Sequence, residues 1–178
     1  MDLRKTAWIG LGLLFLIGCK VLDRGEDWSA AAVPVGLTAW LPCIPVEKPK
    51  EADSPGDRKF ECRASGVLVK LTFYGSDPSG SYDLPKGAAA IAESVRKSAK
   101  DNGGEVTHDQ SSLTVSGLQA VRMKSTFVFP DEKSMIDGVL ISDGEDAWLL
   151  QLIFPTRLAS SLEAQTTKLY QTLEVRPD

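Results

Sequence analysis

The sequence has little of what catalytic and metal sites usually require. Its 178 residues include one histidine and three cysteines, and they contain neither a C-x-x-C pair nor a G-x-S-x-G segment. Nucleophilic hydrolases and zinc sites depend on such side chains in defined arrangements. We therefore expect a protein that is not an enzyme, holds no metal ion and carries no cofactor.

Basic residues are also too few for a protein that binds polyanions. Lysine and arginine number 20 against 24 acidic residues, which gives a formal net charge of −4. Nucleic-acid-binding domains carry a basic patch or stripe, and the sequence has no glycine-rich loop of the kind that cradles phosphates. We expect neither a nucleic acid nor a nucleotide as a partner.

The apolar run at the N-terminus is too short to span a membrane. Residues 7–18 carry no charge and follow the basic pair Arg4 and Lys5. A basic start before a short apolar core is typical of a secretory signal peptide, whereas a spanning helix needs about 20 apolar residues. The sequence therefore predicts export.

The segment Leu16-Ile17-Gly18-Cys19 ends this run. It resembles the lipobox of bacterial lipoproteins, in which aliphatic and small residues precede a cysteine. The resemblance implies cleavage after Gly18, a lipid on the sulfur of Cys19 and acylation of the new N-terminus. Lys20 occupies the position at which an aspartate would retain a lipoprotein in the inner membrane. The resemblance therefore implies sorting to the outer membrane. Two alternatives stay open: an ordinary signal peptide in which Cys19 is incidental, or an uncleaved anchor.

These features divide the chain into three parts. Residues 1–18 are expected to be the signal peptide, 19–36 a lipidated tether and 37–178 one domain of ordinary globular composition, 43% hydrophobic and 25% charged over the chain. The predicted location is the bacterial cell envelope, at the outer membrane and facing the periplasm. Two or more acyl chains on Cys19 give firm membrane attachment.

Two cysteines remain once Cys19 carries lipid. Export places Cys43 and Cys62 where disulfides persist. We expect them to pair and to close a loop of about twenty residues, which contributes roughly 3 kcal/mol on the loop-entropy account. A redox-active pair and two buried free thiols are the alternatives.

The periodicity of the domain predicts strands and two helices. Alternation over residues 67–74 indicates a half-buried strand, and the apolar spacing over 84–102 indicates an amphipathic helix. Further strands are expected at 37–43 and 60–62, between Glu105 and the turn at Ser116-Gly117, and at 118–129, 135–142 and 147–154, and a second helix is expected at 158–173. Turn residues link the later strands into an antiparallel meander. The predicted fold class is α+β, an antiparallel sheet packed with two amphipathic helices in an α-β sandwich.

Three short motifs in this domain resemble the PsbP-like fold. They are Leu41-Pro42, the segment 117–120 followed by Arg122, and the strand 148–155 that leads into the last helix. The likeness covers residues 37–175 and implies the same sandwich, which also occurs in a eukaryotic Ran-binding factor and in bacterial lipoproteins. It implies an accessory or partner-binding module and transfers no catalytic residue.

Asp137 is a charged residue inside an apolar strand pattern. Arg122 and Lys124 lie on a neighbouring expected strand, from which they can pair with Asp137 across the sheet. The alternative interpretation of these three side chains is a polar patch that binds a ligand.

The single histidine is not expected to be catalytic. His108 precedes Asp109 and lies near Ser111 and Ser112, but neighbours in sequence do not make a catalytic triad. A polar loop or an edge strand explains the segment. The acidic run 143–146 contains an Asp-Gly pair, which predicts a hairpin turn rather than a calcium loop.

Three tryptophans remain after cleavage of the signal peptide. Trp40 and Trp148 fall in expected strands and are expected in the core, with a recognition patch as the alternative. For Trp28 two placements stay open, on the domain or at the lipid interface.

The sequence as a whole predicts a lipid-anchored envelope protein that serves as a non-catalytic accessory or partner-binding module. Its partners would be the membrane, through acylated Cys19, and another envelope protein. The alternative is a periplasmic lipoprotein that binds a small ligand in a pocket between the sheet and the helices. An enzyme is the third hypothesis, and it requires polar side chains that converge in one cleft.

Overall fold

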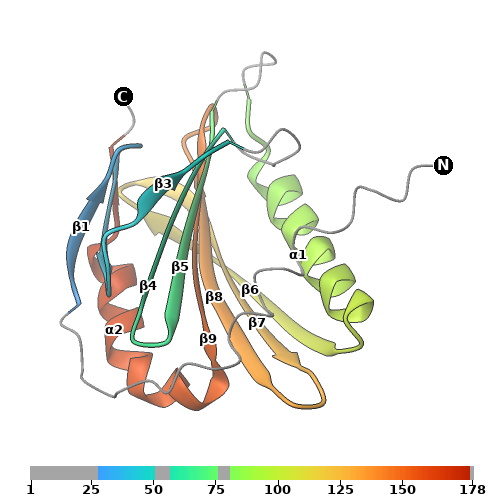
Figure 1. Ribbon diagram of the computed structural model, residues 1–178. Coiled ribbons are helices and arrows are strands. Elements are labelled where there is room, and N and C mark those ends of the chain that lie inside the picture. Colours follow the sequence, from blue (N-terminus) through green and yellow to red (C-terminus); the bar gives the residue numbers. More distant parts are fainter. Residues whose placement is uncertain (1–27, 51–56, 76–80, 177–178) are drawn as a thin grey trace.

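A seven-stranded antiparallel sheet forms the middle of the computed structural model, which describes residues 28–50, 57–75 and 81–176 (Figure 1). The strands lie in the order β3-β4-β5-β9-β8-β7-β6. Their bounds are β3 (Val46–Lys48), β4 (Arg58–Ala64), β5 (Val67–Tyr74), β6 (Glu105–Val115), β7 (Leu118–Val128), β8 (Lys133–Ser142) and β9 (Ala147–Pro155). Successive strands from β6 to β9 pair as the expected meander.

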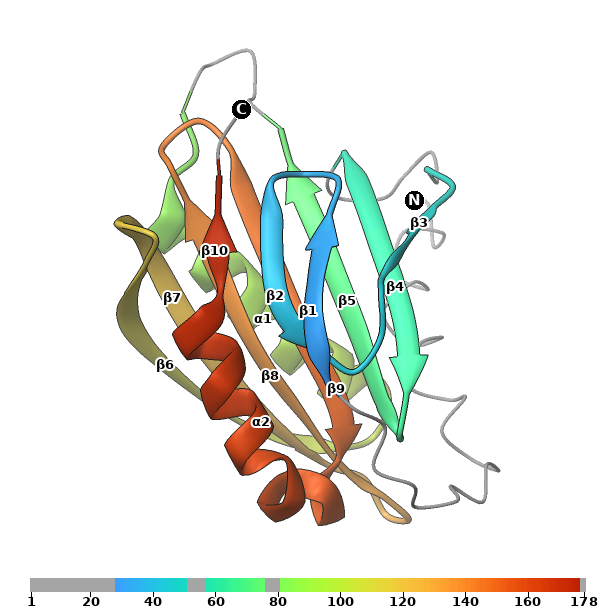
Figure 2. The same cartoon turned by 90° about the vertical axis from the view of Figure 1, so that its left-hand side faces the viewer.

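Other elements cover both faces of this sheet. A three-stranded sheet lies over one face in the order β1-β2-β10 and is accompanied by one helix, while the second helix lies on the opposite face (Figures 1 and 2). The bounds are β1 (Ser29–Val33), β2 (Leu37–Leu41), β10 (Glu174–Val175), α1 (Leu84–Asp101), η3 (Thr156–Leu158) and α2 (Ala159–Thr172). The α-β sandwich predicted from the sequence is confirmed.

Helix α1 packs on β6, β7 and β8 through a stripe of alanine, leucine and valine side chains. Asp83 begins the helix by accepting a hydrogen bond from the backbone N–H of Lys86 at 2.9 Å, as an N-cap does. The buried stripe consists of Leu84, Ala88, Ala92, Val95 and Ala99. Because these side chains recur at helical spacing, one face of α1 is apolar and the other meets solvent.

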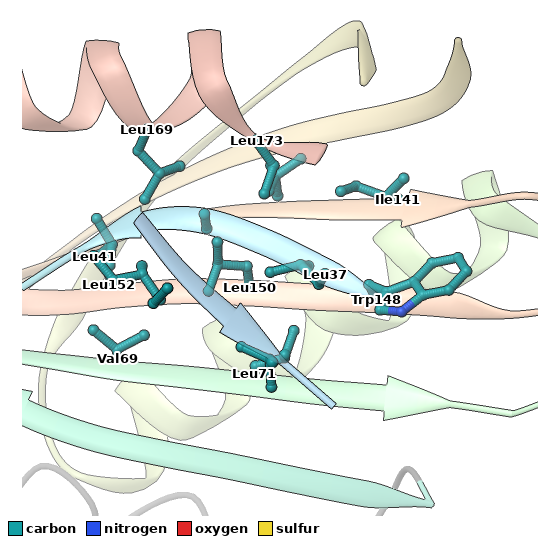
Figure 3. Close-up of a cluster of buried hydrophobic side chains, with 14 of the residues drawn as sticks. Leu37, Leu41, Val69, Leu71, Ile141, Trp148, Leu150, Leu152, Leu169 and Leu173 are labelled. Atoms are coloured by element: carbon teal, nitrogen blue, oxygen red, sulfur yellow. The ribbon is translucent and has the colours of Figure 1, made fainter. Parts of the chain in front are cut away.

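The main core lies between the large sheet and the layer made by α2 and the small sheet (Figure 3). Its central side chains are Leu37, Leu41, Val69, Leu71, Ile141, Trp148, Leu150, Leu152, Leu169 and Leu173. Trp148 is 1% exposed, and its indole N–H donates to the carbonyl of Val35 at 2.7 Å. The core position expected for Trp148 is confirmed, and its polar edge is satisfied by the turn between β1 and β2.

The tether predicted over residues 19–36 is too long at its C-terminal end. Residues 29–33 form β1, which pairs antiparallel with β2 and buries Ala31 and Val33. Trp28 is 8% exposed and belongs to the main core, so it docks on the domain. Small alanines give no strong polar-apolar alternation, and this is why the strand was not evident from the sequence.

The strands at the two edges of the large sheet compare differently with the sequence prediction. The polar segment around His108 belongs to β6, an 11-residue strand at the edge of the large sheet, in agreement with one of the two interpretations offered. The short strand β3 was not predicted, because its three residues alternate too briefly to give a signal. Both strands acquire their structure by pairing, β6 with β7 and β3 with β4.

The expected disulfide between Cys43 and Cys62 is present. It links the segment after β2 to β4 and thereby joins the small sheet to the large one. A disulfide of this kind is typical of proteins that fold outside the cytosol.

The predicted signal peptide, the predicted lipidation site Cys19 and the first part of the predicted tether lie outside the described residues. Within the described ranges, no helix has the length and apolar character needed to cross a bilayer.

Candidate functional site

The carboxylate of Asp137 receives hydrogen bonds from two different elements. Its Oδ1 accepts from the Tyr170 hydroxyl at 2.6 Å and from Arg122 Nε at 3.0 Å, and its Oδ2 accepts from Arg122 Nη2 at 2.7 Å. Lys124 Nζ lies 3.8 Å from Oδ2. The side chain of Asp137 is only 3% exposed, so this carboxylate is buried with its charge compensated.

The register of the meander explains the arrangement. Lys124 lies directly opposite Asp137, and Arg122 lies opposite Val139, two residues along on the same face. Tyr170 comes from α2, and the Arg122 guanidinium stacks over its ring at 4.1 Å from the centroid. The three residues named from the sequence are therefore brought together, and the structure adds a fourth.

The cluster also changes the acidity of Tyr170. Burial raises the pKa of its hydroxyl far above the usual value of about 10, and the neighbouring negative charge of Asp137 raises that pKa further. Tyr170 therefore remains a hydrogen-bond donor at all physiological pH values. The chemistry that the cluster supports is a fixed ionic link between α2 and the sheet.

A shallow concavity lies beside this cluster, over β6 and β7. Its volume is about 240 Å³, and its lining residues are Asp109, Gln110, Ser111, Arg122 and Lys124. Positive and negative side chains are mixed here, which favours a polar ligand with both donors and acceptors over a simple anion. A second open concavity has a volume of about 430 Å³ and lies beside the turn between β7 and β8. It is lined by Asp131, Glu132, Lys133, Thr156 and Arg157.

His108 does not join the Asp137 cluster. It lies opposite Ser125 in the ladder, whereas Asp109 lies opposite Lys124, so His108 and Asp137 point to different faces of the sheet. Its Nδ1 is 2.7 Å from the Ser125 hydroxyl. Burial lowers the pKa of His108, and the positive charge of Arg96 lowers that pKa further.

The acidic run 143–146 forms the hairpin turn between β8 and β9 that the sequence predicted. Oδ1 of Asp143 accepts hydrogen bonds from the backbone N–H groups of Glu145 and Asp146 at 2.9 and 2.8 Å. Gly144 has a positive φ of 103°. Within the described part of the chain, no group of three or more histidine, cysteine, aspartate or glutamate residues lies close enough to hold a metal ion.

Trp40 is partly buried against the main core, on β2. The ammonium of Lys168 on α2 lies 3.2 Å from the centroid of its indole ring. This cation–π contact gives the indole ring a partner within the molecule, and part of the Trp40 side chain remains accessible to solvent.

Two apolar side chains are strongly exposed at the opposite edge of the sheet. Ile44 is 69% exposed and Val46 is 67% exposed, and they lie two positions apart at the start of β3. Two contacts hold this segment in place: the disulfide at Cys43, and a bidentate pair in which Arg58 donates to Glu47 at 2.8 Å from Nε and from Nη2.

Sequence reasoning missed Tyr170, Ile44 and Val46 as members of candidate sites. Tyr170 is 33 residues from Asp137 in the sequence, and only the packing of α2 brings them together. Ile44 and Val46 lie within a stretch rich in proline and charge, which carries no signal of a rigid surface. The short β3 pairing that holds them was itself not predicted.

Comparison with solved structures shows the PsbP-like fold. The chain superposes on the cyanobacterial PsbP, CyanoP, of Synechocystis sp. PCC 6803 with a TM-score of 0.61, covering 90% of this chain and 99% of that one at 7% sequence identity. A protein of unknown function from Pseudomonas aeruginosa gives a TM-score of 0.52, covering 88% and 89% of the two chains at 15% identity. No protein-family model and no curated protein matches the sequence. At such low identities the likeness concerns the fold alone.

Proposed function

We propose that this protein is a lipid-anchored accessory module of the bacterial cell envelope that binds another envelope protein and performs no catalysis. The observation that carries this proposal is the exposed pair of Val46, the first residue of β3, and Ile44, two residues before it. Buried in an interface, each side chain would contribute about 1.5–3 kcal/mol.

The structure around β3 favours binding because the exposed pair is held by neighbouring contacts. Cys43 is bonded to Cys62, and Glu47 is paired with Arg58. A contact segment that is ordered before it binds loses less conformational entropy on association. Its exposed apolar side chains therefore suit a partner surface better than a mobile loop would.

Membrane attachment rests on the lipobox-like segment that ends at Cys19. The disulfide supports an oxidising location outside the cytosol. Acylation at Cys19 would hold the domain at the envelope, with Lys20 directing it to the outer membrane. Trp28 already packs into the main core, so at most residues 19–27 remain for the tether.

The arrangement of the polar side chains supports a non-catalytic role. Both oxygens of Asp137 accept hydrogen bonds within the molecule, and those donors compete with any proton transfer to a substrate. His108 faces the other side of the sheet. An acid-base pair of these two residues would therefore need a rearrangement of the strands.

Cross-linking in intact cells, followed by affinity capture and mass spectrometry, tests this function. We expect one dominant partner with the wild-type protein and a yield lower by at least about tenfold for the Ile44→Ser, Val46→Ser double variant. Val128→Ser is the matched control, because Val128 is also an exposed apolar residue but lies on β7. Cys19→Ala should weaken the cross-link. Equal capture by the wild type and the double variant, or no partner above background, would contradict the proposal.

A second candidate function is the binding of a small polar ligand in the concavity of about 240 Å³ beside Arg122 and Lys124. A metabolite extract would then raise the melting temperature of the wild type but not of Lys124→Ala. A dominant cross-linked partner without any thermal shift would exclude this candidate.

A further inference from the structure

Strand β6 forms one edge of the seven-stranded sheet. It has 11 residues, stands last in the strand order and pairs with β7 over its whole length, from Glu105 opposite Val128 to Val115 opposite Leu118. The register is constant, so no bulge interrupts the ladder. Figure 2 shows β6 along one border of the molecule, with neither helix extending beyond it.

Two hairpin turns fix which backbone groups of β6 point outward. Val115 and Leu118 flank a two-residue turn in which Ser116 and Gly117 have positive φ angles of 51° and 82°, so this closing pair exchanges hydrogen bonds. Bonded pairs alternate along an antiparallel ladder. The odd-numbered residues of β6 therefore bond to β7, and the even-numbered residues 106 to 114 direct their N–H and C=O groups away from it.

The hairpin between β7 and β8 independently gives the same assignment of bonded and outward-facing residues. The Phe129 N–H donates to the Glu132 carbonyl at 2.8 Å, so odd residues of β7 bond to β8 and even residues bond to β6.

Natural sheets protect long edges with lysine, proline or bulges, or keep them very short. The other edge of this sheet, β3, has three residues, whereas β6 contains no lysine and no proline and has an unbroken register. Its charged side chains are Glu105 and Asp109. An edge of this length, with only these two charged side chains to protect it, is a template for another strand.

We propose that the partner of this edge is a second copy of the same chain, paired antiparallel β6 to β6 around Gln110. This register places Gln110 against its own counterpart and lets the five outward residues of each copy donate and accept, for about ten hydrogen bonds. Registers centred two residues away, on His108 or Ser112, retain only about six.

The charges on β6 fit this register. Glu105 comes to lie opposite Val115 of the second copy, and Asp109 lies opposite Ser111 of the second copy, so no acidic residue faces another. His108 lies opposite Ser112 of the second copy. A second copy also presents an edge of equal length that is already extended, whereas a flexible peptide would have to be ordered first.

A cysteine at the centre of the interface tests the register directly. Gln110→Cys is introduced into the full chain with Cys19→Ala, so that the new thiol is free while Cys43 and Cys62 remain paired. Bonded antiparallel pairs have Cα atoms about 5.5 Å apart, within the range that a disulfide spans. Under mild oxidation we expect a covalent dimer.

Ser112→Cys in the same background is the matched control. It is exposed on the same edge and face, but its counterpart in the proposed register lies about 13 Å away along the strand. We expect no cross-link from this variant alone and a restored dimer when His108→Cys is added. Equal cross-linking of Gln110→Cys and Ser112→Cys would indicate random collision and overturn the register.

The mass of the uncross-linked protein in detergent solution provides a second measurement. Ser112→Pro removes an outward N–H and leaves the ladder with β7 intact, so the melting temperature should change little while the dimer dissociation constant rises at least about tenfold. A monomeric wild type, a dimer unaffected by this variant, or exclusive pairing of β6 with another protein would overturn the proposal. The proposed function concerns β3, at the other edge, so its failure would leave this result unchanged.

Discussion

Asp137 lies on a face of β8 that otherwise packs into the main core, with Val139 and Ile141 following it at alternate positions. Its charge is stable there because Arg122 and Tyr170 supply donors at 2.6 to 3.0 Å. The hydrogen bond from Tyr170 to Asp137 also attaches helix α2 to the sheet. A buried carboxylate with these partners is a structural link. Removing one partner destabilises the fold, because the remaining buried charge is no longer compensated.

Asp137→Ala should lower the free energy of unfolding by about 2–4 kcal/mol, since it leaves Arg122 and the Tyr170 hydroxyl without their acceptor. The lower part of this range applies because Arg122 is 29% exposed and can turn toward water. Urea denaturation measures the change. Glu61→Ala is the control, because Glu61 pairs with Lys70 at 3.4 Å near the surface and should cost less than about 1 kcal/mol. Equal losses for the two variants would contradict this role for Asp137.

Alkaline pH should destabilise the fold through buried tyrosines. Burial raises the pKa of Tyr74 to about 12 and the pKa of Tyr170 still higher, whereas an unfolded tyrosine titrates near 10. Above about pH 10 the folded state therefore binds more protons than the unfolded state, and the free energy of unfolding falls as pH rises. Urea titrations from pH 8 to pH 11.5 measure this slope. Tyr170→Phe should reduce this dependence of the free energy of unfolding on pH. An unchanged slope in that variant would contradict the contribution assigned to Tyr170.

The cross-strand partners of Asp137 could be named from the sequence because strand pairing follows the turn signals of the meander. Tyr170 could not, since no local pattern specifies which turn of α2 meets which strand. The same limit applies to Trp40, whose cation–π partner Lys168 lies on that helix. Contacts between distant segments depend on packing and leave no periodic trace.

Among the secondary-structure elements, those with strong periodicity were predicted and those defined by pairing alone were not. β5 and α1 carry clear apolar spacing and match their expected ranges closely. β1 consists mostly of alanine and depends on β2 for its structure. Its detection would have required knowledge of which edge of β2 remained unpaired.

The turn between β1 and β2 depends on Gly36. This residue has a φ of +69°. A Cβ at this position would collide with the carbonyl oxygen of Arg176. The backbone N–H of Arg176 also donates to the Gly36 carbonyl at 2.8 Å. Gly36→Ala should cost more than about 1 kcal/mol and loosen β10 from β2. Hydrogen exchange at Arg176, compared with Gly117→Ala at an open turn, measures the effect; full protection in the Gly36 variant would contradict it.

The disulfide should stabilise the junction of the two sheets. The Cys43→Ser, Cys62→Ser double variant is expected to lose about 3 kcal/mol on the loop-entropy account, for a sequence separation of 19. Thermal unfolding of this variant, with reduced wild type as the control, checks the value. A melting temperature equal to that of the oxidised wild type would contradict a stabilising role.

For the molecule as a whole, the fold could be predicted from the sequence, whereas the proposed docking surface could not. The sandwich is shared with a cyanobacterial PsbP at 7% identity, which shows that many sequences satisfy the same layer packing. Fold alone does not assign a function, and the proposed function depends on particular surface residues, Ile44 and Val46.

The proposed attachment to the envelope makes a direct prediction about mass. The protein extracted from membranes should lack residues 1–18 and carry lipid on Cys19, whereas Cys19→Ala should retain its N-terminus. Intact mass spectrometry of both proteins measures this difference. An unmodified Cys19 in the membrane-extracted wild type would contradict the anchor while leaving the disulfide and the fold untouched.

The most direct test of the partner-binding account places a photo-reactive amino acid at Val46 and, separately, at Val128 in cells that express the otherwise unchanged chain. Both positions are exposed, at 67% and 39%, but they lie on β3 and β7. We predict one discrete cross-linked protein from the probe at Val46 and none from the probe at Val128. No cross-link from Val46, or the same products from both positions, would contradict a docking surface at β3.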